Sequence, residues 1–273
     1  DWLQYEQNPI LAGGGIWKCS GHGTLVQTPD QRYFYLYHAY HAYDFEFVGR
    51  QGLLDELRWD EKTGWPYFRY GALPSVQAAL PFQGTSQQKT SRFYDNFTQD
   101  ESDLHWLWDM NLSKPLLSKK DGVLSLTAPQ AGLCFRGVNP QSGNYSMETS
   151  VAVNEAANLK GLCVYGNPKN LLAWGIAGKH LKLYQWKDNN KTELFSHPLE
   201  ASKVYLRIVS ANARAFRFQW SENGKDWHSY PQAGSAIDGN FLPQWGKGVR
   251  AGLLVENNKQ NTGSFAYFLI ENR

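Results

Sequence analysis

Residues 31–39, QRYFYLYHA, follow the dipeptide Pro29-Asp30 and are dense in aromatic side chains. Tyr and Phe favour the pleated surface of a sheet and Pro-Asp marks a turn, so we predict a strand here. A second strand is predicted over residues 52–59, GLLDELRW, ended by the turn residues Gly64-Trp65-Pro66. Residues 38–43, HAYHAY, place His and Tyr on both faces and are interpreted as strand edge and loop.

Short alternating runs of the same kind fill the second half of the chain. Residues 71–90 shift to Ala, Pro, Gln, Ser and Gly without a clear period, which is typical of a linker or of an arm lying on a surface. Alternating patterns typical of strands begin again at Arg92. Residues 187–191 and Asn223-Gly224 are of the types that form tight turns between strands. Such spacing predicts an all-β sandwich or jelly roll. The predicted strands are residues 93–97, 122–127, 133–137, 145–153, 161–165, 171–176, 180–186, 204–210, 213–220, 249–256 and 264–270.

Composition excludes several classes of function. The 273 residues carry 27 basic and 25 acidic side chains, spread thinly, so the chain lacks the basic patch of a nucleic-acid binder. It also lacks a run of about 18 apolar residues, so we predict no membrane span. The aromatic share of 15%, with eleven Trp, suits a β-rich core and also suits stacking on sugar rings.

The three cysteines, Cys19, Cys134 and Cys163, lie far apart and show no CxxC spacing. A thiolate zinc site is therefore disfavoured. Cys134 and Cys163 could form a disulfide only if their strands are neighbours. Otherwise we expect three free thiols that are buried or half buried.

Hydrolysis of a glycoside needs two carboxyl groups that flank a sugar-sized gap. Asp44 and Glu46 are expected to share a strand face, which is not the geometry required. We interpret all the candidates in the first seventy residues as solvated charges or turn residues. These candidates are Asp30, Asp44, Glu46, Asp55, Glu56, Asp60 and Glu61.

Polar and aromatic residues of three other kinds are candidates for binding. His22 lies in Gly21-His22-Gly23-Thr24, where the alternative is a tight turn with a hydrogen-bonded histidine. Arg50 offers a rigid fork of donors that suits paired sugar hydroxyls, or is an ordinary surface arginine at a strand end. A calcium or sugar site in the second half would use Asp95 and four tryptophans that we expect to be exposed, Trp106, Trp108, Trp174 and Trp186, with core packing and turn capping as the alternative.

Several motifs together resemble the last blade of glycoside hydrolase family 43. They are Asn8-Pro9-Ile10-Leu11, Gly21-His22-Gly23-Thr24, Pro29-Asp30 with Tyr33, Tyr35, Tyr37, His38 and Ala39, Gly49-Arg50, and Trp59-Asp60 with Gly64-Trp65-Pro66. The remainder, from Phe93-Tyr94-Asp95-Asn96-Phe97 onward, resembles the concanavalin-like sandwich behind many β-xylosidases and arabinofuranosidases of that family. The resemblance implies a last blade of a five-bladed β-propeller in residues 1–72, a linker or arm in 73–91, and a concanavalin-like β-sandwich (jelly roll) in 92–273.

The resemblance also implies a function. Family members hydrolyse β-xylosides or α-L-arabinofuranosides with inversion, using an Asp base, a Glu acid and a second Asp from earlier blades. No motif of this sequence matches those carboxylates, so we expect no catalytic residue in this chain and an inactive protein when it stands alone. Two substrate-binding residues carry over from the resemblance: Arg50 on the innermost sugar, and His22 at the funnel floor, beside a calcium ion that it meets through water.

The expected partners are an oligosaccharide from xylan or arabinan and the missing N-terminal part of the propeller, in cis or as a separate chain. The chain opens with Asp-Trp-Leu rather than Met, so we expect its natural start to be missing. The alternative function is a non-catalytic sandwich that binds carbohydrate or merely supports the propeller. The sequence does not determine the cellular compartment, although a periplasmic or secreted protein is favoured.

Overall fold

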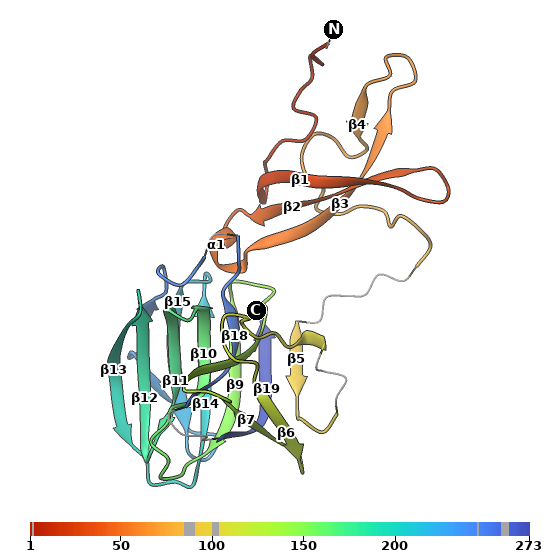
Figure 1. Ribbon diagram of the computed structural model, residues 1–273. Helices are drawn as coiled ribbons and strands as arrows, with labels where there is room; N and C mark the ends of the chain where they lie inside the picture. The colour runs from red at the N-terminus through yellow and green to blue at the C-terminus, as the bar shows by residue number, and fades with distance from the viewer. Residues whose placement is uncertain (2, 85–90, 100–103, 245, 258–261) are drawn as a thin grey trace. The chain divides into compact units, whose positions relative to one another are not determined.

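The computed structural model describes residues 1, 3–84, 91–99, 104–244, 246–257 and 262–273. The chain divides into two compact units, Asp1–Lys89 and Thr90–Arg273. Both are built from antiparallel strands (Figure 1), and the one short helix among the described residues is α1, Phe45–Val48. Across the described ranges, none of the helical structure has the length and apolar character needed to span a membrane. The all-β fold class is thus confirmed.

The first unit is a four-stranded antiparallel sheet in the order β1-β2-β3-β4. Such a meander is the form of a propeller blade. The interpretation of residues 38–43 as strand edge and loop is wrong for residues 38–41, which end an inner strand that pairs on both sides. The strands are β1 Trp17–Gln27, β2 Tyr33–His41, β3 Arg50–Trp59 and β4 Pro66–Phe68.

One face of this sheet is covered, whereas on the other only Phe34 and Glu56 of β2 and β3 are buried. Tyr37, Ala39 and Leu53 form a small buried cluster, against which Leu11 and Tyr35 pack. Residues 72–82 run along the same unit, where the N–H of Ala12 donates to the carbonyl of Ala72 (2.7 Å).

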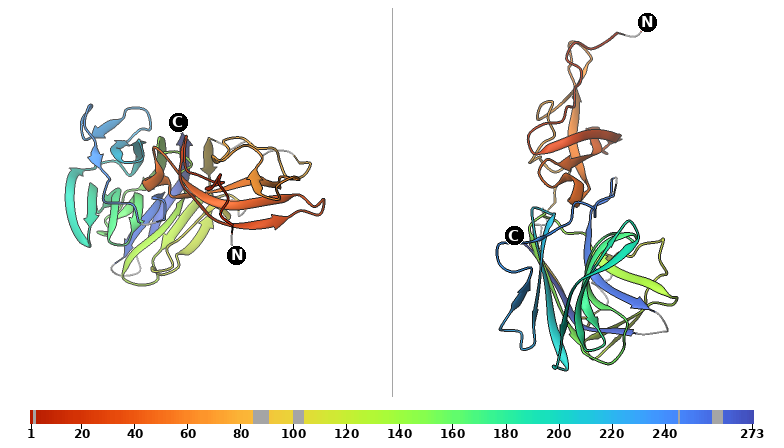
Figure 2. Two further views of the ribbon diagram at one scale, coloured as in Figure 1. Left: turned by 90° about the horizontal axis from the view of Figure 1, so that it is seen from above. Right: turned by 90° about the vertical axis from the view of Figure 1, so that its left-hand side faces the viewer.

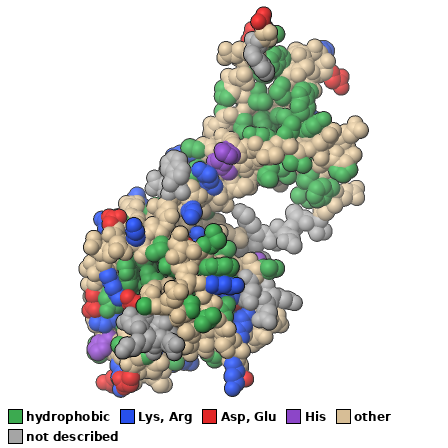
Figure 3. All heavy atoms as spheres, in the orientation of Figure 1, with side chains coloured by type: hydrophobic (Ala, Val, Ile, Leu, Met, Phe, Trp, Pro, Cys, Tyr) green, Lys and Arg blue, Asp and Glu red, His purple; other side chains and the backbone are tan. Residues whose placement is uncertain are grey.

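The opposite face carries an exposed apolar stripe. Leu36 on β2 pairs with Leu54 on β3, and Val26 lies on the neighbouring strand β1. These three side chains are 52%, 38% and 48% exposed. Figure 3 shows hydrophobic side chains gathered on the surface of this unit. The residues that the structure describes therefore leave this apolar stripe exposed.

The second unit is a sandwich of two antiparallel sheets, seen as two layers in the right-hand view of Figure 2. The six-stranded sheet has the order β13-β12-β11-β10-β18-β8. The nine-stranded sheet has the order β16-β15-β14-β9-β19-β7-β6, with β17 paired to β15 and β5 to β19. The strands are β5 Arg92–Asp95, β6 Leu116–Lys120, β7 Val123–Thr127, β8 Gly132–Val138, β9 Tyr145–Ala152, β10 Lys160–Asn167, β11 Asn170–Ala177, β12 His180–Lys187, β13 Asn190–Pro198, β14 Lys203–Ala211, β15 Ala215–Ser221, β16 His228–Tyr230, β17 Ile237–Asp238, β18 Arg250–Asn257 and β19 Thr262–Asn272.

Alternation along the strands builds the core between the layers. On β14, Val204, Leu206 and Ile208 are fully buried, whereas Tyr205 and Arg207 on the other face are half buried. This is the period of two that a sheet with one buried face requires. The predicted sandwich is confirmed.

The outer face of the six-stranded sheet holds a second buried cluster. Phe135 and Tyr165 stack with ring centroids 4.2 Å apart. Leu112, in the segment that precedes β6, packs on this cluster, and nearby Asp109 accepts a hydrogen bond from the Tyr165 hydroxyl at 2.8 Å. A connecting segment thus seals apolar surface that the sandwich would otherwise expose.

The order of the strands decides whether Cys134 and Cys163 can form a disulfide. β18 lies between β8 and β10, so Cys134 and Cys163 are not on neighbouring strands and cannot form a disulfide. Both are buried free thiols, and burial raises the pKa of Cys134 to about 12. The expectation is wrong for Cys19, which is exposed.

Candidate functional site

The Gly-His-Gly motif lies where β1 departs from regular pairing with β2. The register shifts between Lys18 and Gly21 and again between Gly21 and Thr24. His22 has a positive φ of 51°, which a non-glycine residue adopts only in special backbone positions. Bulges of this kind turn a side chain away from the direction that the pleat would give it.

Gly23 lets the backbones of β1 and β2 approach each other closely. A Cβ at this position would lie 2.5 Å from the carbonyl oxygen of Leu36 and 2.7 Å from Cβ of Tyr37. The N–H of Gly23 donates to the Tyr35 hydroxyl at 3.0 Å. Glycine is therefore required here for packing, and the double irregularity in β1 is held in place by the next strand.

The structure brings the two predicted binding residues together around a third. His22 lies beside His38 of β2, with ring centroids 6.0 Å apart. Arg50 begins β3 and is paired in register with Tyr40, whose hydroxyl accepts its Nε–H at 3.0 Å. Since His38 and Tyr40 are two apart on one strand, they share a face of the sheet. We call His22, His38, Tyr40 and Arg50 the histidine-arginine cluster.

The surroundings of His38 favour the neutral form of its imidazole. Burial, followed by the positive charge of Arg50 and the proximity of His22, lowers the pKa of His38. A neutral imidazole offers one donor and one acceptor nitrogen. Arg50 is exposed, and its bond to Tyr40 uses only Nε–H, one of the five N–H donors of a guanidinium. The cluster can therefore bind a polyhydroxylated ligand.

Two of the carboxylates interpreted as solvated charges are in fact buried, so that interpretation is wrong for Asp55 and Glu56. Asp55 accepts hydrogen bonds from the Tyr37 hydroxyl at 2.5 Å and from the Ser75 hydroxyl. Glu56 accepts from Arg58 (2.9 Å) and Arg69 (2.7 Å). Buried charge of this kind is stable only when paired, and both carboxylates hold segments of the first unit together.

The other carboxylates of the first unit cap turns or lie at the surface. Asp60 accepts the N–H groups of Lys62 and Thr63 in the turn after β3. The expectation that Asp44 and Glu46 share a strand face is wrong, because α1 occupies residues 45–48 and the Asp44 carbonyl accepts its first N–H bonds. Asp30 binds Thr28 and Arg32, and Glu61 is exposed.

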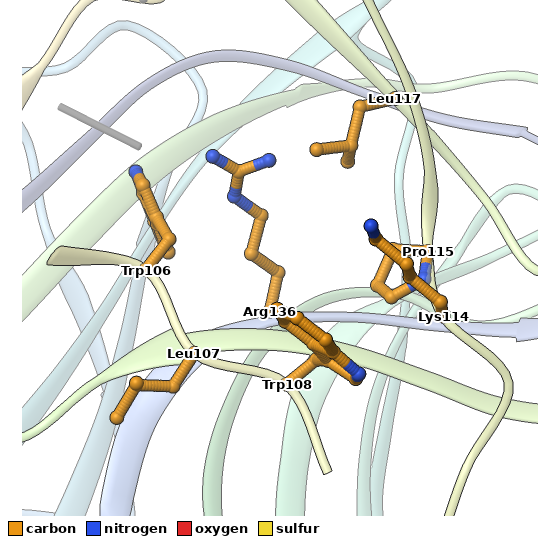
Figure 4. A pocket seen from close by; sticks show the side chains of 7 residues that line it. All are labelled: Trp106, Leu107, Trp108, Lys114, Pro115, Leu117 and Arg136. Carbon is orange, nitrogen blue, oxygen red and sulfur yellow. The ribbon is translucent and has the colours of Figure 1, made fainter. Parts of the chain in front are cut away.

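The candidates in the sandwich are mostly structural. Trp174 and Trp186 are buried, and buried Trp106 donates its Nε1–H to Asp95 at 2.8 Å. The expectation of exposure is therefore wrong for Trp106, Trp174 and Trp186, and the Asp95 carboxylate holds the Trp106 indole in place. Trp108 is 42% exposed, with the Lys114 ammonium 5.3 Å from the centre of its ring, and lines a cavity of about 240 Å³ (Figure 4).

The calcium ion that the resemblance implies can be compared with the side chains present. Calcium takes six to eight oxygen ligands. Within the described ranges, no three His, Cys, Asp or Glu side chains converge in a way that could hold a metal ion. The histidine-arginine cluster offers nitrogen and cationic groups, so the side chains that the structure describes do not by themselves supply the oxygen ligands of a calcium site.

Comparison with known proteins gives the family. Residues 94–270 match the family model described as the β-xylosidase C-terminal concanavalin A-like domain of glycoside hydrolase family 43. The chain belongs to this family. The recognition made from the sequence motifs is thereby confirmed.

Relatives of family 43 also match the fold of the whole chain. A β-xylosidase of Formosa agariphila is 21% identical over 95% of this chain and 49% of its own length. The crystal structure of the GH43 protein BlXynB from Bacillus licheniformis gives a TM-score of 0.81 at 20% identity, covering 100% of this chain and 58% of that one. A xylan β-1,4-xylosidase from Bacillus halodurans gives 0.78 at 18% identity, covering 98% and 57%. The chain thus spans about half the length of the curated relative it matches.

Two members of the histidine-arginine cluster, His22 and Arg50, were predicted as binding residues from their motifs, whereas His38 and Tyr40 were not. His38 and Tyr40 were interpreted as strand edge and loop because their stretch places His and Tyr on both faces of a strand. The register between β2 and β3 is what identifies them: Arg50 pairs with Tyr40, and Gly52, two residues further along β3, pairs with His38. Pairing between distant strands is not visible from one strand's pattern.

Proposed function

We propose that this chain is the C-terminal part of a glycoside hydrolase that acts on β-xylosides or α-L-arabinofuranosides of plant cell-wall hemicellulose. Family membership of the sandwich supports a hydrolase of the xylosidase type. The observation that carries the proposal is the convergence of His22, His38 and Arg50 on one end of the blade-like sheet. These groups suit a sugar whose hydroxyls must be oriented.

In this proposal the bond-breaking groups lie upstream of the chain. An inverting glycosidase places a carboxylic acid and a carboxylate on opposite sides of the scissile bond, with a water beside the carboxylate. The two buried carboxylates of the first unit, Asp55 and Glu56, are engaged in structural bonds. The acid, the base and the second Asp therefore come from the preceding part of the propeller.

This chain's own residues bind and orient the sugar. The terminal N–H groups of Arg50 donate to neighbouring hydroxyls of the innermost sugar, and the neutral imidazole of His38 exchanges a hydrogen bond with another. Fixing the sugar in this way lowers the entropic part of the barrier. A hydrated calcium ion beside His22 would meet the imidazole only through water, and its oxygen ligands would have to come from the upstream part.

The test compares the whole hydrolase, expressed with its upstream segment, with the 273-residue chain alone. The substrates are 4-nitrophenyl β-xyloside and α-L-arabinofuranoside, and the product anomer is followed by NMR. We expect turnover with inversion by the whole protein and none by this chain. Arg50→Ala should lower kcat/KM about 100-fold, because orientation of the sugar is lost.

Arg58→Lys is the matched control, since Arg58 lies on the same strand and a lysine keeps the positive charge beside buried Glu56. It should leave kcat/KM within about twofold. Turnover by the purified 273-residue chain would contradict the upstream placement of the carboxylates. Full activity in the Arg50→Ala protein would remove the proposed role of the cluster.

A further inference from the structure

Gly52 is the only residue without a side chain on the face of β2 and β3 that carries the histidine-arginine cluster. Arg50 pairs with Tyr40, and Gly52, two residues further along β3, pairs with His38. Residues two apart on a strand project from the same face, so these four positions are the corners of one patch. A side chain projects from three of the corners, and none projects from Gly52.

The place of the missing side chain is open. A Cβ built on Gly52 would meet no heavy atom of the described part of the chain within 4 Å, apart from its chain neighbours. Gly23 on β1 is the opposite case, because a Cβ there would lie 2.5 Å from the carbonyl oxygen of Leu36. The φ of Gly52 also lies outside the left-handed region. Neither packing nor backbone conformation therefore requires a glycine at this position.

A glycine inside a strand weakens the strand, and it often marks a bulge or a place where a ligand or another backbone comes close. The pairing of β2 with β3 continues without a register shift from Tyr33–Leu57 to Tyr40–Arg50, so Gly52 marks no bulge. Since no described backbone lies against it either, a ligand is the reason that remains within this chain.

The surroundings of the open position are polar on one side and apolar on the other. On the polar side, the Tyr40 hydroxyl holds the Nε–H of Arg50 at 3.0 Å, which leaves the terminal N–H groups of the guanidinium for other acceptors. On the other side, Leu36 and Leu54 form the next pair along the strands and are 52% and 38% exposed. A sugar has the same division, because it carries hydroxyl groups and apolar C–H surfaces.

We propose that Gly52 is a specificity-determining residue of the sugar site. In this proposal the innermost pentose, whose hydroxyls Arg50 and His38 bind, occupies the space that a side chain at position 52 would fill. The inference rests on the proposed hydrolase, because it names the residue that sets the size of that hydrolase's sugar site. A side chain at position 52 should then exclude the sugar and leave the sheet intact.

Kinetics of the whole hydrolase with the series Gly52→Ala, Gly52→Val and Gly52→Leu test this assignment. The substrates are 4-nitrophenyl β-xyloside and α-L-arabinofuranoside. We expect kcat/KM to fall as the side chain grows, by at least about tenfold in Gly52→Val, since one or two carbon atoms change the fit of a pocket on this scale. The loss should appear as a higher KM, because the added methyl groups meet the bound substrate and the transition state alike.

Two further measurements separate exclusion of the sugar from damage to the fold. The Kd of free xylose and of free arabinose, measured by calorimetry on the whole protein, should rise with KM across the series. The Tm of Gly52→Val in the 273-residue chain should be unchanged or higher, because valine favours strands. Gly84→Val is the matched control: a Cβ there also meets no atom within 4 Å, outside the cluster, so kcat/KM should stay within about twofold.

Three outcomes would overturn the assignment. An unchanged KM and pentose Kd across the series would mean that the sugar does not occupy this space. An equal loss in Gly84→Val would mean that the effect is not local. A whole protein destabilised by Gly52→Val, with the 273-residue chain unaffected, would mean that the upstream part fills the space instead.

Failure of the hydrolase proposal would look different. The unsubstituted whole protein would then turn over neither substrate, or Arg50→Ala would keep full activity. Pentose binding by calorimetry does not depend on turnover, so the comparison of the parent protein with Gly52→Val would still decide whether a sugar occupies the space at position 52.

Discussion

The first unit and the sandwich bury their apolar surface to different extents. In the sandwich, both faces of the six-stranded sheet are covered, one by the other sheet and one by the segment that carries Leu112. In the first unit the face that carries Tyr37 and Leu53 is covered, whereas the face that carries Leu36 is buried only around Phe34 and Glu56. The difference teaches that the sandwich contains its own core, whereas the first unit leaves Val26, Leu36 and Leu54 exposed.

Separating the two units gives the largest expected effect. Residues 90–273, produced alone, should unfold in one cooperative transition at the temperature of the intact chain's main transition. Residues 1–89 alone should show no cooperative melt, because a small sheet with one open apolar face buries too little surface. Calorimetry and size-exclusion chromatography check both. A monomeric residue 1–89 fragment with a sharp melt would break the comparison.

Two leucine truncations measure the same contrast at single positions. Leu206→Ala removes a fully buried side chain from β14 and should lower the free energy of unfolding by about 2–5 kcal/mol. Leu36→Ala removes a side chain that is 52% exposed and should cost less than about 0.5 kcal/mol in this chain. Urea unfolding measures both.

The truncation at Leu36 becomes more informative in the whole hydrolase. If the upstream segment covers this face, the cost of Leu36→Ala should rise above about 1 kcal/mol there. An equal, small cost in both proteins would mean that the stripe of Val26, Leu36 and Leu54 stays exposed.

Two glycines of the first unit give a smaller, local contrast. Gly23→Ala would press a methyl group against the Leu36 carbonyl and the Tyr37 side chain, and should destabilise the β1–β2 pairing by about 1–3 kcal/mol. Gly52→Ala meets no atom within 4 Å, so it should be neutral or stabilising by up to about 1 kcal/mol. Hydrogen exchange of the β1 and β2 amides measures the free energy of local opening in each variant. Equal protection in the two variants would contradict the contrast.

The strands were predictable where one face is buried, because burial produces the period of two. Residues 204–210 are an example, and β14 spans Lys203–Ala211. The strand β13, Asn190–Pro198, was missed because it is an edge strand with most of its side chains exposed, so its sequence carries no alternation. The turn before it was predicted: Asp188 and Asn189 both have positive φ, as a tight hairpin turn requires.

The candidate site was predictable only in part, for a related reason. His22 and Arg50 stand in motifs that a sequence displays directly. The burial of Asp55 depends on Ser75, which reaches it from a segment with no periodic signal at all. Likewise, the cavity beside Trp108 arises from strands β6 and β8 together with the preceding segment, a pairing set by the fold and not by local propensity.

The smallest expected effect concerns alkaline pH. In the sandwich, burial and the hydrogen bond to Asp109 raise the pKa of Tyr165 well above its ordinary value near 10. A raised folded-state pKa means that this contribution to stability is complete below pH 10 and is lost as the pH rises further, because only the unfolded chain ionises. Each such tyrosine should cost about 1.4 kcal/mol per pH unit above 10.

Tyr165→Phe should therefore flatten the loss of stability between pH 10 and pH 11, beyond its own cost of roughly 1 kcal/mol at neutral pH for the lost bond to Asp109. Tyr94→Phe, at a 48% exposed position in the same unit, is the matched control. Urea unfolding of residues 90–273 at several pH values measures both slopes. An unchanged slope in Tyr165→Phe would mean that the buried hydroxyl ionises as readily folded as unfolded. The seal over the outer cluster would then be looser than the bond between Tyr165 and Asp109 implies, and the sandwich would resemble the first unit more than its packing indicates.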